Sequence, residues 1–194
     1  MPLYASGCSA LQAQNNLFKL PFKEVKMFRF FIVCWLAVAL QGCASGPSLE
    51  GQPYYNGPTI SNSNVATVYF FREHHPIGRG VAQDISINEE VVGSLSSGGY
   101  FMVQLDPGVK KVRARRTQFL QGDLGDADFV IDVAPGRIYF FAQETSSVPY
   151  SDRREVSKVR KGGFNYIQYY FRWAVVPQNE AEMRMRFCRL NPAP

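Results

Sequence analysis

The sequence is poor in the residues and motifs on which most enzymes and metal proteins depend. It holds two histidines and four cysteines. It contains no Gly-x-Ser-x-Gly nucleophile motif, no Gly-rich phosphate loop and no cysteine beside a suitable base. The spacings of Cys8, Cys34, Cys43 and Cys188 do not match a zinc site. We therefore expect no enzyme activity, no metal and no other cofactor.

A strong net charge is also missing from the larger part of the chain. Residues 1–42 contain four of the 21 basic residues and one of the 16 acidic residues, which leaves 17 and 15 for the rest. The chain from Cys43 onward therefore has a net charge of only +2. A charge of this size gives no reason to expect a nucleic-acid partner.

What is present at the N-terminus is the pattern of a signal peptide. A basic patch that contains Lys26 and Arg29 is followed by an apolar run over residues 30–40. This run has the length of a signal-peptide core and is too short to span a bilayer comfortably. Since signal peptides usually start close to their basic patch, we expect Met27 to be the true start, with a long N-terminal region from Met1 as the alternative.

The residues at the end of this pattern carry the prediction of a membrane anchor. Leu40-Gln41-Gly42-Cys43 resembles the bacterial lipobox, in which the cysteine is acylated and the preceding peptide bond is cut. Leu40, Gln41 and Gly42 match the motif, although Gln41 stands where Ala or Ser is more usual. The resemblance implies a signal peptide over residues 1–42 and lipidation of Cys43. The alternative is a buried core helix that ends by chance in a cysteine.

The residues after Cys43 predict where such an anchor would place the protein. Ala44, rather than an acidic residue, follows the cysteine. By analogy with Gram-negative lipoproteins, this predicts sorting to the periplasmic face of the bacterial outer membrane. Residues 43–64 are rich in Gly, Pro, Ser and Asn, a composition typical of a flexible tether. We expect a folded domain over residues 65–194.

The pattern from Val65 onward is that of strands. Short apolar runs with period two are separated by Gly, Pro and Asn. The predicted strands are residues 65–72, 84–88, 91–95, 100–105, 109–117, 129–133, 137–143 and 166–176. Since each sheet must cover its apolar face with another sheet, we predict an all-β fold, an antiparallel β-sandwich of about seven to eight strands.

One short helix is expected at the C-terminal end, over residues 178–189. Asn179 followed three residues later by Glu182 has the spacing of a capping box. In such a helix Met183, Phe187 and Leu190 would share one face, which we expect to be buried.

The order of motifs between Thr67 and Ala114 is similar to that of the bacterial lipoprotein family with a domain of unknown function, DUF2846. The motifs are residues 68–72, 85–88, 92–95, 98–101 and 105–108. The resemblance covers residues 65–176 and implies a β-domain in the cell envelope, with no active site to carry over. Relatives usually have Asn-Gly where this chain has Asn88-Glu89. Because Glu tolerates positive φ poorly, we expect a longer turn that includes Glu90.

A basic run in the fifth predicted strand is a candidate contact for anions. Lys111, Arg113 and Arg115 alternate with Val112 and Ala114, which predicts one solvated and one buried face. The candidate contacts for lipid headgroups or lipopolysaccharide phosphates are Lys110, Lys111, Arg113 and Arg115. The alternative is an ordinary solvated strand face. A second basic cluster over residues 153–161 is interpreted as a solvated loop.

Four further features have a functional and a structural interpretation. His74 and His75, with Glu73, are either metal ligands or part of a solvated loop, and we favour the loop. The acidic loop contains Asp123, Asp126 and Asp128. The aromatic strand, which would suit glycan stacking, contains Tyr166, Tyr169, Tyr170, Phe171 and Trp173. The thiol of Cys188 is either buried or forms an intermolecular disulfide.

The sequence as a whole predicts a lipid-anchored envelope protein with a β-sandwich domain. We expect this domain to bind an envelope protein or glycan, or to act as a structural support. The competing hypothesis is a hydrolase that modifies an envelope polymer. A deep pocket with converging, perturbed side chains would favour the hydrolase, and a shallow surface would favour binding.

Overall fold

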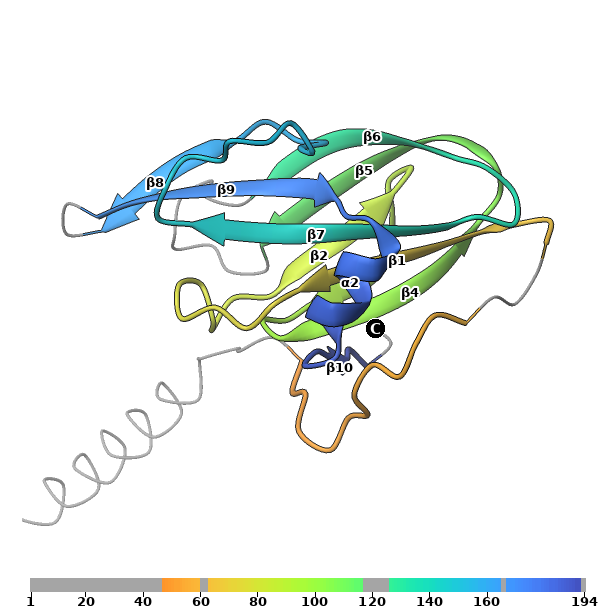
Figure 1. The fold of residues 1–194 in the computed structure, drawn as a ribbon, viewed down its shortest axis with the longest axis horizontal. Coiled ribbons are helices and arrows are strands. Elements are labelled where there is room, and N and C mark those ends of the chain that lie inside the picture. The colour runs from red at the N-terminus through yellow and green to blue at the C-terminus, as the bar shows by residue number, and fades with distance from the viewer. Residues whose placement is uncertain (1–46, 60–62, 117–125, 165–166, 193–194) are drawn as a thin grey trace, which may run out of the picture. The chain divides into compact units, whose positions relative to one another are not determined.

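The computed structural model describes residues 47–59, 63–116, 126–164 and 167–192, and every structural statement below refers to these residues (Figure 1). The lipobox residues Leu40, Gln41, Gly42 and Cys43 lie outside them, as does the predicted signal peptide. In the part of the chain that the structure describes, no helix has the length and hydropathy needed to cross a membrane.

Two β-sheets and a short C-terminal helix make up the fold, which confirms the predicted all-β sandwich. One sheet has six strands in the order β10-β4-β1-β7-β9-β8, and the other has four in the order β3-β2-β5-β6. The strands are β1 (Ala66–Arg72), β2 (Gln83–Ile87), β3 (Glu90–Leu95), β4 (Gly99–Leu105), β5 (Gly108–Arg116), β6 (Ala127–Val133), β7 (Ile138–Ser146), β8 (Arg160–Phe164), β9 (Ile167–Val175) and β10 (Arg189–Leu190).

The strand pairing departs from a purely antiparallel sandwich at two places. β1 pairs with β7 in parallel, and β10 pairs with β4 in parallel, whereas the other pairs are antiparallel. β8 and β10 were not among the predicted strands. β8 contains Arg160 and Lys161, so the prediction of a solvated loop is wrong for these two residues.

The core between the sheets forms from alternate side chains, as the period of two requires. In β6, every second residue from Ala127 to Val133 is buried and those between are exposed. Aromatic rings fill the centre, where Phe70 stacks on Phe101 and Phe141 with ring centroids 5.4 and 5.7 Å apart. Trp173 packs edge-on against Phe70 at 5.9 Å. Such buried rings contribute most of the apolar area that stabilises a domain of this kind.

The six-stranded sheet is covered on its other face as well, which explains why all seven residues of β1 are buried. Phe70 points into the core between the sheets, while Tyr69 and Phe71 point to the opposite side and join a second apolar cluster. Helix α2 (Gln178–Met185) contributes Ala181 and Met185 to this cluster. Figure 1 shows α2 lying across the sheet on this side.

Helix α2 is present as predicted but is shorter and is oriented differently. Its N-cap is Pro177 and no side chain makes a capping hydrogen bond, so the predicted capping box is wrong. Met183 and Phe187 are 60% and 69% exposed, so the predicted buried face is also wrong. The small Ala181 faces the sheet instead, because it lets the helix approach the aromatic rings closely.

The N-terminal segment, residues 47–59, belongs to the stretch predicted as a flexible tether, yet it lies against the domain. The Tyr55 amide donates to the carbonyl oxygen of Cys188 at 3.0 Å, and the Leu190 amide donates to that of Pro53 at 2.9 Å. The Tyr55 ring is buried and packs edge-on against Tyr69 and Tyr100. Tyr55 therefore supplies the apolar anchor that holds this segment in place.

The turn between β2 and β3 has two residues, so the prediction of a longer turn is wrong. Ile87 pairs with Glu90, and Asn88 and Glu89 both have positive φ, at 48° and 75°. Asn88 is held against β5 by two hydrogen bonds, from its amide to the Lys111 carbonyl and from the Lys111 amide to its side chain. These bonds offset the backbone strain at Glu89.

Candidate functional site

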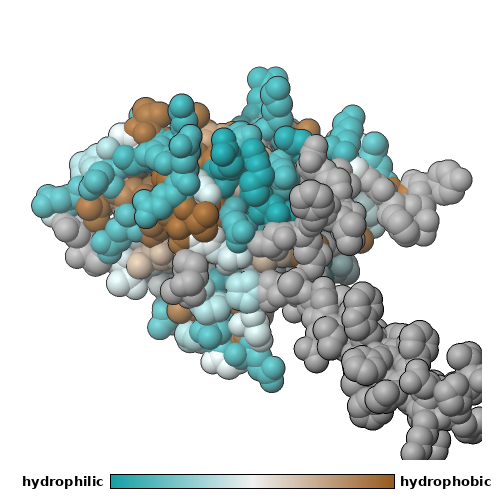
Figure 2. Space-filling model, turned by 180° about the vertical axis from the view of Figure 1, so that it is seen from behind, coloured by the Kyte–Doolittle hydropathy of each residue, from teal (hydrophilic) through white to brown (hydrophobic). Residues whose placement is uncertain are grey.

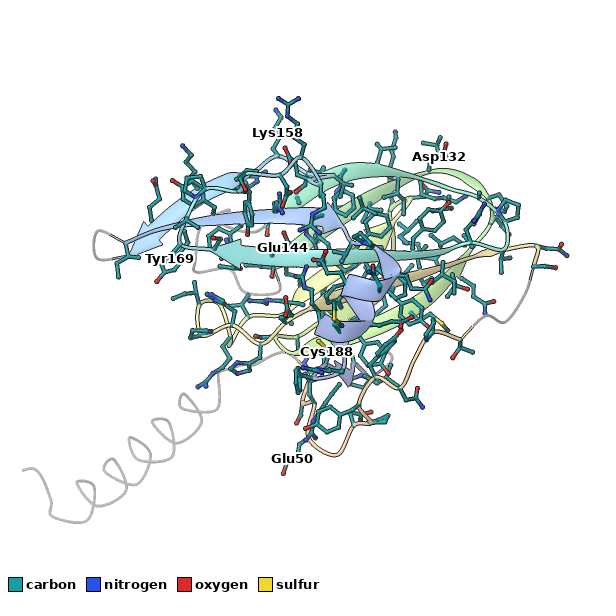
Figure 3. The ribbon with its side chains drawn as sticks, viewed as in Figure 1. Glu50, Asp132, Glu144, Lys158, Tyr169 and Cys188 are labelled. Carbon is teal, nitrogen blue, oxygen red and sulfur yellow. The ribbon has the colours of Figure 1, made fainter. Side chains whose placement is uncertain are left out.

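A polar pocket of about 390 Å³ lies at one end of the six-stranded sheet, next to α2. Four separate parts of the chain supply its lining: β7 together with the loop that follows it, β9, the loop after β1, and α2. The lining residues are Glu73, His74, His75, Gln143, Glu144, Thr145, Tyr150, Asp152, Arg154, Arg172 and Arg184. Figure 3 shows Glu144 beside α2.

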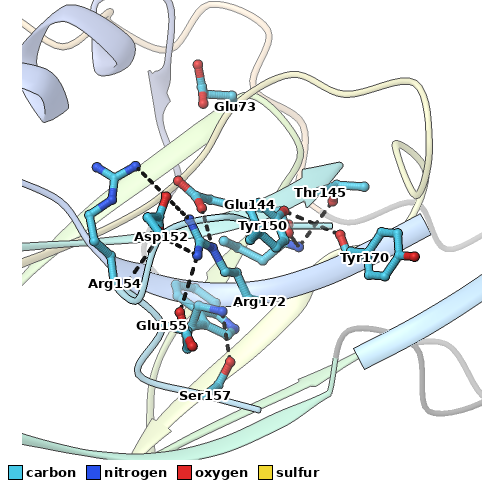
Figure 4. Close-up of polar contacts among 12 residues, drawn as sticks. Glu73, Glu144, Thr145, Tyr150, Asp152, Arg154, Glu155, Ser157, Tyr170 and Arg172 are labelled. Carbon is cyan, nitrogen blue, oxygen red and sulfur yellow. Dashed lines mark hydrogen bonds and ion pairs between the residues drawn. The ribbon is translucent and has the colours of Figure 1, made fainter. Parts of the chain in front are cut away.

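Arg172 forms the centre of this site, and the strand register places it there. In the antiparallel pair of β7 and β9, Arg172 lies directly opposite Glu144. Its Nε donates to Glu144 Oε2 at 2.7 Å, and its two Nη atoms donate to the two oxygens of Asp152 at 2.6 and 3.0 Å (Figure 4). This bidentate geometry uses the planar guanidinium fully. A longer bond of 3.4 Å joins it to Glu155.

An aromatic ring completes the surroundings of Arg172. The guanidinium carbon lies 3.8 Å from the centre of the Tyr150 ring, within the range of a cation–π contact. The Tyr150 hydroxyl donates to the carbonyl oxygen of Tyr170 at 3.3 Å, which fixes the ring over the arginine. With a side chain only 1% exposed, Arg172 is therefore a buried charge whose every side is occupied.

Two further arginines link the site to α2. Arg184 of α2 reaches Glu144 at 2.7 Å and Glu73 at 2.6 Å. Arg154 reaches Glu180 of α2 at 2.6 Å and Asp152 at 3.3 Å. We call Arg154, Arg172, Arg184 and their carboxylate partners the Arg172 cluster. The cluster joins the helix to the sheet through charged hydrogen bonds rather than apolar packing alone.

The surroundings in the Arg172 cluster move the pKa values of its groups away from neutral pH. Hydrogen bonds from Arg172 lower the pKa of Asp152. Burial, together with Glu144, raises the pKa of Tyr150 to about 12. Burial works against the charge of Arg172, but the bonds to Asp152 and Glu144 outweigh it and raise its pKa. These groups keep one protonation state over the neutral range, whereas acid–base catalysis works best with a pKa near the working pH.

The charges that line the pocket are balanced. Three carboxylates face three guanidinium groups, and His74 and His75 also line the pocket. In the described ranges, no three His, Cys, Asp or Glu side chains are placed to hold a metal ion. The His75 ring accepts a hydrogen bond from the Ile77 amide at 3.1 Å, a contact within its own loop. The pocket is thus suited to hydrogen bonding with an uncharged polar ligand.

The predicted anion contacts on β5 lie on two faces. Val112 and Ala114 are buried and Lys111 and Arg113 are exposed, as the alternation predicts, but Lys110 points to the side opposite Lys111. Arg113 and Arg115 are both paired with Asp128 of β6, at 3.2 and 2.8 Å. Figure 2, which shows the molecule from behind, has hydrophilic side chains interspersed with apolar ones.

Several of the remaining candidate residues have structural partners. Asp126 accepts a hydrogen bond from the Arg116 amide, and Asp123 and Tyr166 lie outside the described residues. In the aromatic strand, Trp173 is buried and Tyr170 lies under Lys161 at 5.7 Å. Cys188 is buried, which agrees with the interpretation of a buried thiol (Figure 3). Burial raises the pKa of this thiol to about 12.

The Arg172 cluster was missed by the sequence analysis. One local signal was available, since Arg172 interrupts a run of aromatic and apolar residues in a predicted strand. A charge in a buried strand needs partners. Those partners come from residues 73 to 184, so the sequence alone could not identify them.

The fold and this site define a two-sheet β domain with a charge-balanced polar pocket beside its C-terminal helix. The family model "Protein of unknown function (DUF2846)" matches residues 62–163, slightly more than half of the chain. The protein therefore belongs to the DUF2846 family, which confirms the DUF2846 domain that its motifs indicated. The match includes Glu144 and Asp152 and ends before Arg172. No curated protein and no solved structure matches the chain.

Proposed function

We propose that the protein is a lipoprotein of the bacterial cell envelope, anchored by lipid on Cys43 at the periplasmic face of the outer membrane. The observation that carries this proposal is the sequence Leu40-Gln41-Gly42-Cys43 directly after a basic patch and an apolar run of signal-peptide length. The motifs between Thr67 and Ala114 support it, since they resemble those of bacterial lipoproteins with this domain.

In this proposal the β domain acts by binding or as a structural support, and not as an enzyme. The pocket at the Arg172 cluster is built of side chains that bond to one another at 2.6–3.4 Å. Hydrogen bonds from Arg172 lower the pKa of Asp152, which opposes a role for this carboxylate as general acid. An envelope protein or an envelope glycan could use the remaining polar groups of the pocket. A polymer hydrolase would need a titratable group poised near neutrality.

The anchor is tested by intact-mass analysis of protein extracted from membranes, with Cys43→Ser measured beside the wild type. We expect the wild-type protein to begin at Cys43 and to carry a diacylglycerol and an acyl chain, and the variant to lack them. Fractionation of inner and outer membranes then tests the location.

Two outcomes would contradict the proposal. A wild-type protein that retains residues 1–42 would mean that the apolar run is an uncleaved segment. A protein that is cut but gains no lipid would mean that the run is an ordinary secretion signal.

A further inference from the structure

Side-chain hydrogen bonds from the domain hold the chain at Pro47 and Leu49. The Ser96 hydroxyl donates to the Pro47 carbonyl oxygen at 3.0 Å. Two residues later, the Leu49 carbonyl oxygen accepts a hydrogen bond from Arg189 Nη1 at 3.3 Å. Ser96 directly follows β3, in the turn that leads to β4, and Arg189 belongs to β10, which pairs with β4 at the edge of the six-stranded sheet. The N-terminal segment is therefore fixed to one edge of the domain from Pro47 onward.

The chain between this point and the proposed anchor is short. Pro47 is four residues after Cys43. A fully extended chain of four residues spans at most about 14 Å. Lipid on Cys43 would therefore hold the surface around Pro47 close to the headgroups, whatever conformation the intervening residues adopt.

The surface at Pro47 contains a second pocket, of about 260 Å³, which we call the Arg79 pocket. Its lining includes Pro47, Leu49, His74, Arg79, Ser96 and Ser97. No carboxylate is among the lining residues, and in the described part of the chain Arg79 has no ion-pair partner. The Arg79 guanidinium and the His74 imidazole at one pocket are suited to a phosphate group, whereas the hydroxyls of Ser96 and Ser97 already donate to the carbonyl oxygens of Pro47 and His75.

The other basic surfaces of the domain lack this combination. The arginines of the Arg172 cluster are neutralised by carboxylates, and Arg113 and Arg115 share Asp128. Lys110 and Lys111 lie past the far end of β4, whose seven residues separate them from Ser97 by about 20 Å. Arg189 also lies near Pro47 without an ion-pair partner among the described residues, but its two Nη atoms donate to the Leu49 carbonyl oxygen and the Tyr54 hydroxyl. The Arg79 pocket thus offers an arginine with neither kind of partner among the described residues at a position that the anchor would hold at the membrane.

We propose that the Arg79 pocket binds the phosphate group of a membrane phospholipid next to the lipid on Cys43. This inference rests on the proposed function, because the anchor supplies the proximity. The contact would hold the domain with its Pro47 edge toward the membrane. The β4–β5 turn, at the other end of β4 from Ser97, would then face away from the membrane or along it.

The test uses the full chain, processed in a Gram-negative host and reconstituted into two kinds of vesicle. One kind is phosphatidylethanolamine with phosphatidylglycerol, and the other is digalactosyl-diacylglycerol, which has no phosphate. Sedimentation with vesicles reports the anchor. Amide hydrogen exchange of residues 74–80 and 96–98 reports the pocket.

The matched variants are Arg79→Glu, Arg79→Gln and, as a control, Lys111→Glu. Arg79 and Lys111 are both exposed and have no ion-pair partner among the described residues, so these changes should leave the fold intact. We expect exchange in both segments to be about fivefold slower on phospholipid than on galactolipid, equivalent to about 1 kcal/mol. Arg79→Glu should abolish the difference, Arg79→Gln should reduce it, and Lys111→Glu should leave it unchanged.

Three results would overturn the inference, and they can be told apart. Equal exchange on both vesicles, with normal sedimentation, would show that the pocket does not contact phospholipid although the anchor exists. Protection on galactolipid after addition of inorganic phosphate, equal to that on phospholipid, would assign the pocket to free phosphate. A wild-type protein that sediments with neither vesicle would overturn the proposed anchor itself.

Discussion

Two groups of arginines and carboxylates in this domain have similar bond lengths but very different surroundings. Arg172 bonds Glu144 and Asp152 at 2.7 and 2.6 Å, and Arg115 bonds Asp128 at 2.8 Å. Arg172 is buried under Tyr150, whereas Arg113 and Asp128 are 54% and 60% exposed. The bond lengths therefore do not distinguish the two groups, whereas the burial of the arginine does.

The difference in burial indicates which of the two groups contributes more to the stability of the fold. Exposed ion pairs contribute about 0–1 kcal/mol, because water and salt screen them and ordering the side chains costs entropy. A buried pair is different, because removal of one partner leaves the other charged group without water or a counter-ion. The Arg172 cluster should therefore respond strongly to substitution, and the β5–β6 pairs weakly.

The largest effect is expected from Arg172→Ala. This change removes the central cation and leaves Glu144, which is itself largely buried, with Arg184 as its remaining partner. We expect a loss of about 3–5 kcal/mol in the free energy of unfolding, measured by urea denaturation with tryptophan fluorescence. Arg113→Ala is the matched control and should change it by less than about 1 kcal/mol. Equal losses in the two variants would contradict the comparison.

An intermediate effect is expected at the aromatic side of the cluster. Tyr150→Leu removes the ring over Arg172, and a cation–π contact in a partly desolvated site contributes about 0.5–2 kcal/mol. Tyr150→Phe keeps the ring and removes only the hydrogen bond to Tyr170, so its loss in unfolding free energy should be smaller. A larger loss in the phenylalanine variant would mean that the hydroxyl, and not the ring, supports Arg172.

Acid should weaken the cluster in a defined direction. Hydrogen bonds from Arg172 lower the pKa of Asp152 in the folded protein. Its contribution to stability is thus present above the unfolded pKa of about 3.9 and is lost as the pH falls below that value toward the folded pKa. Unfolding free energies measured between pH 7 and pH 2 should fall in the acid range. Arg172→Ala should reduce this fall, and an unchanged pH profile in that variant would assign the acid sensitivity to other carboxylates.

The smallest effect is expected from Asp128→Ala on β6. Arg113 and Arg115 would both lose their partner but remain hydrated, so the unfolding free energy should change by no more than about 1 kcal/mol. Added salt should reduce even this difference between variant and wild type. A loss of several kcal/mol that salt does not affect would show that this exposed group resembles the buried one.

The strands were predictable because their residues follow local rules. In β6 the buried and exposed residues alternate without interruption, and the pattern is visible in the sequence. The DUF2846 motifs between Thr67 and Ala114 were visible for the same reason, since they lie within consecutive strands and their turns. In such segments the nearest neighbours in the chain decide the local structure.

The features that the sequence could not predict depend on distant partners. Glu89 takes positive φ because β5 holds the neighbouring Asn88 in place. Met183 is exposed because the aromatic surface beneath α2 accepts the smaller Ala181. The Arg172 cluster combines residues 73 to 184, and its partners share no spacing that a motif could capture.

The joining of the N-terminal segment to β10 has a consequence for the order in which the domain forms. Arg189 bonds Leu49 across 140 residues and Tyr54 across 135 residues. Contacts between such distant positions form late in folding, because a long loop must first close. The partners of residues 49 and 54 exist only once Arg189 has been synthesised. The edge of β4 that β10 covers thus remains open until residues 189 and 190 are available to pair with it.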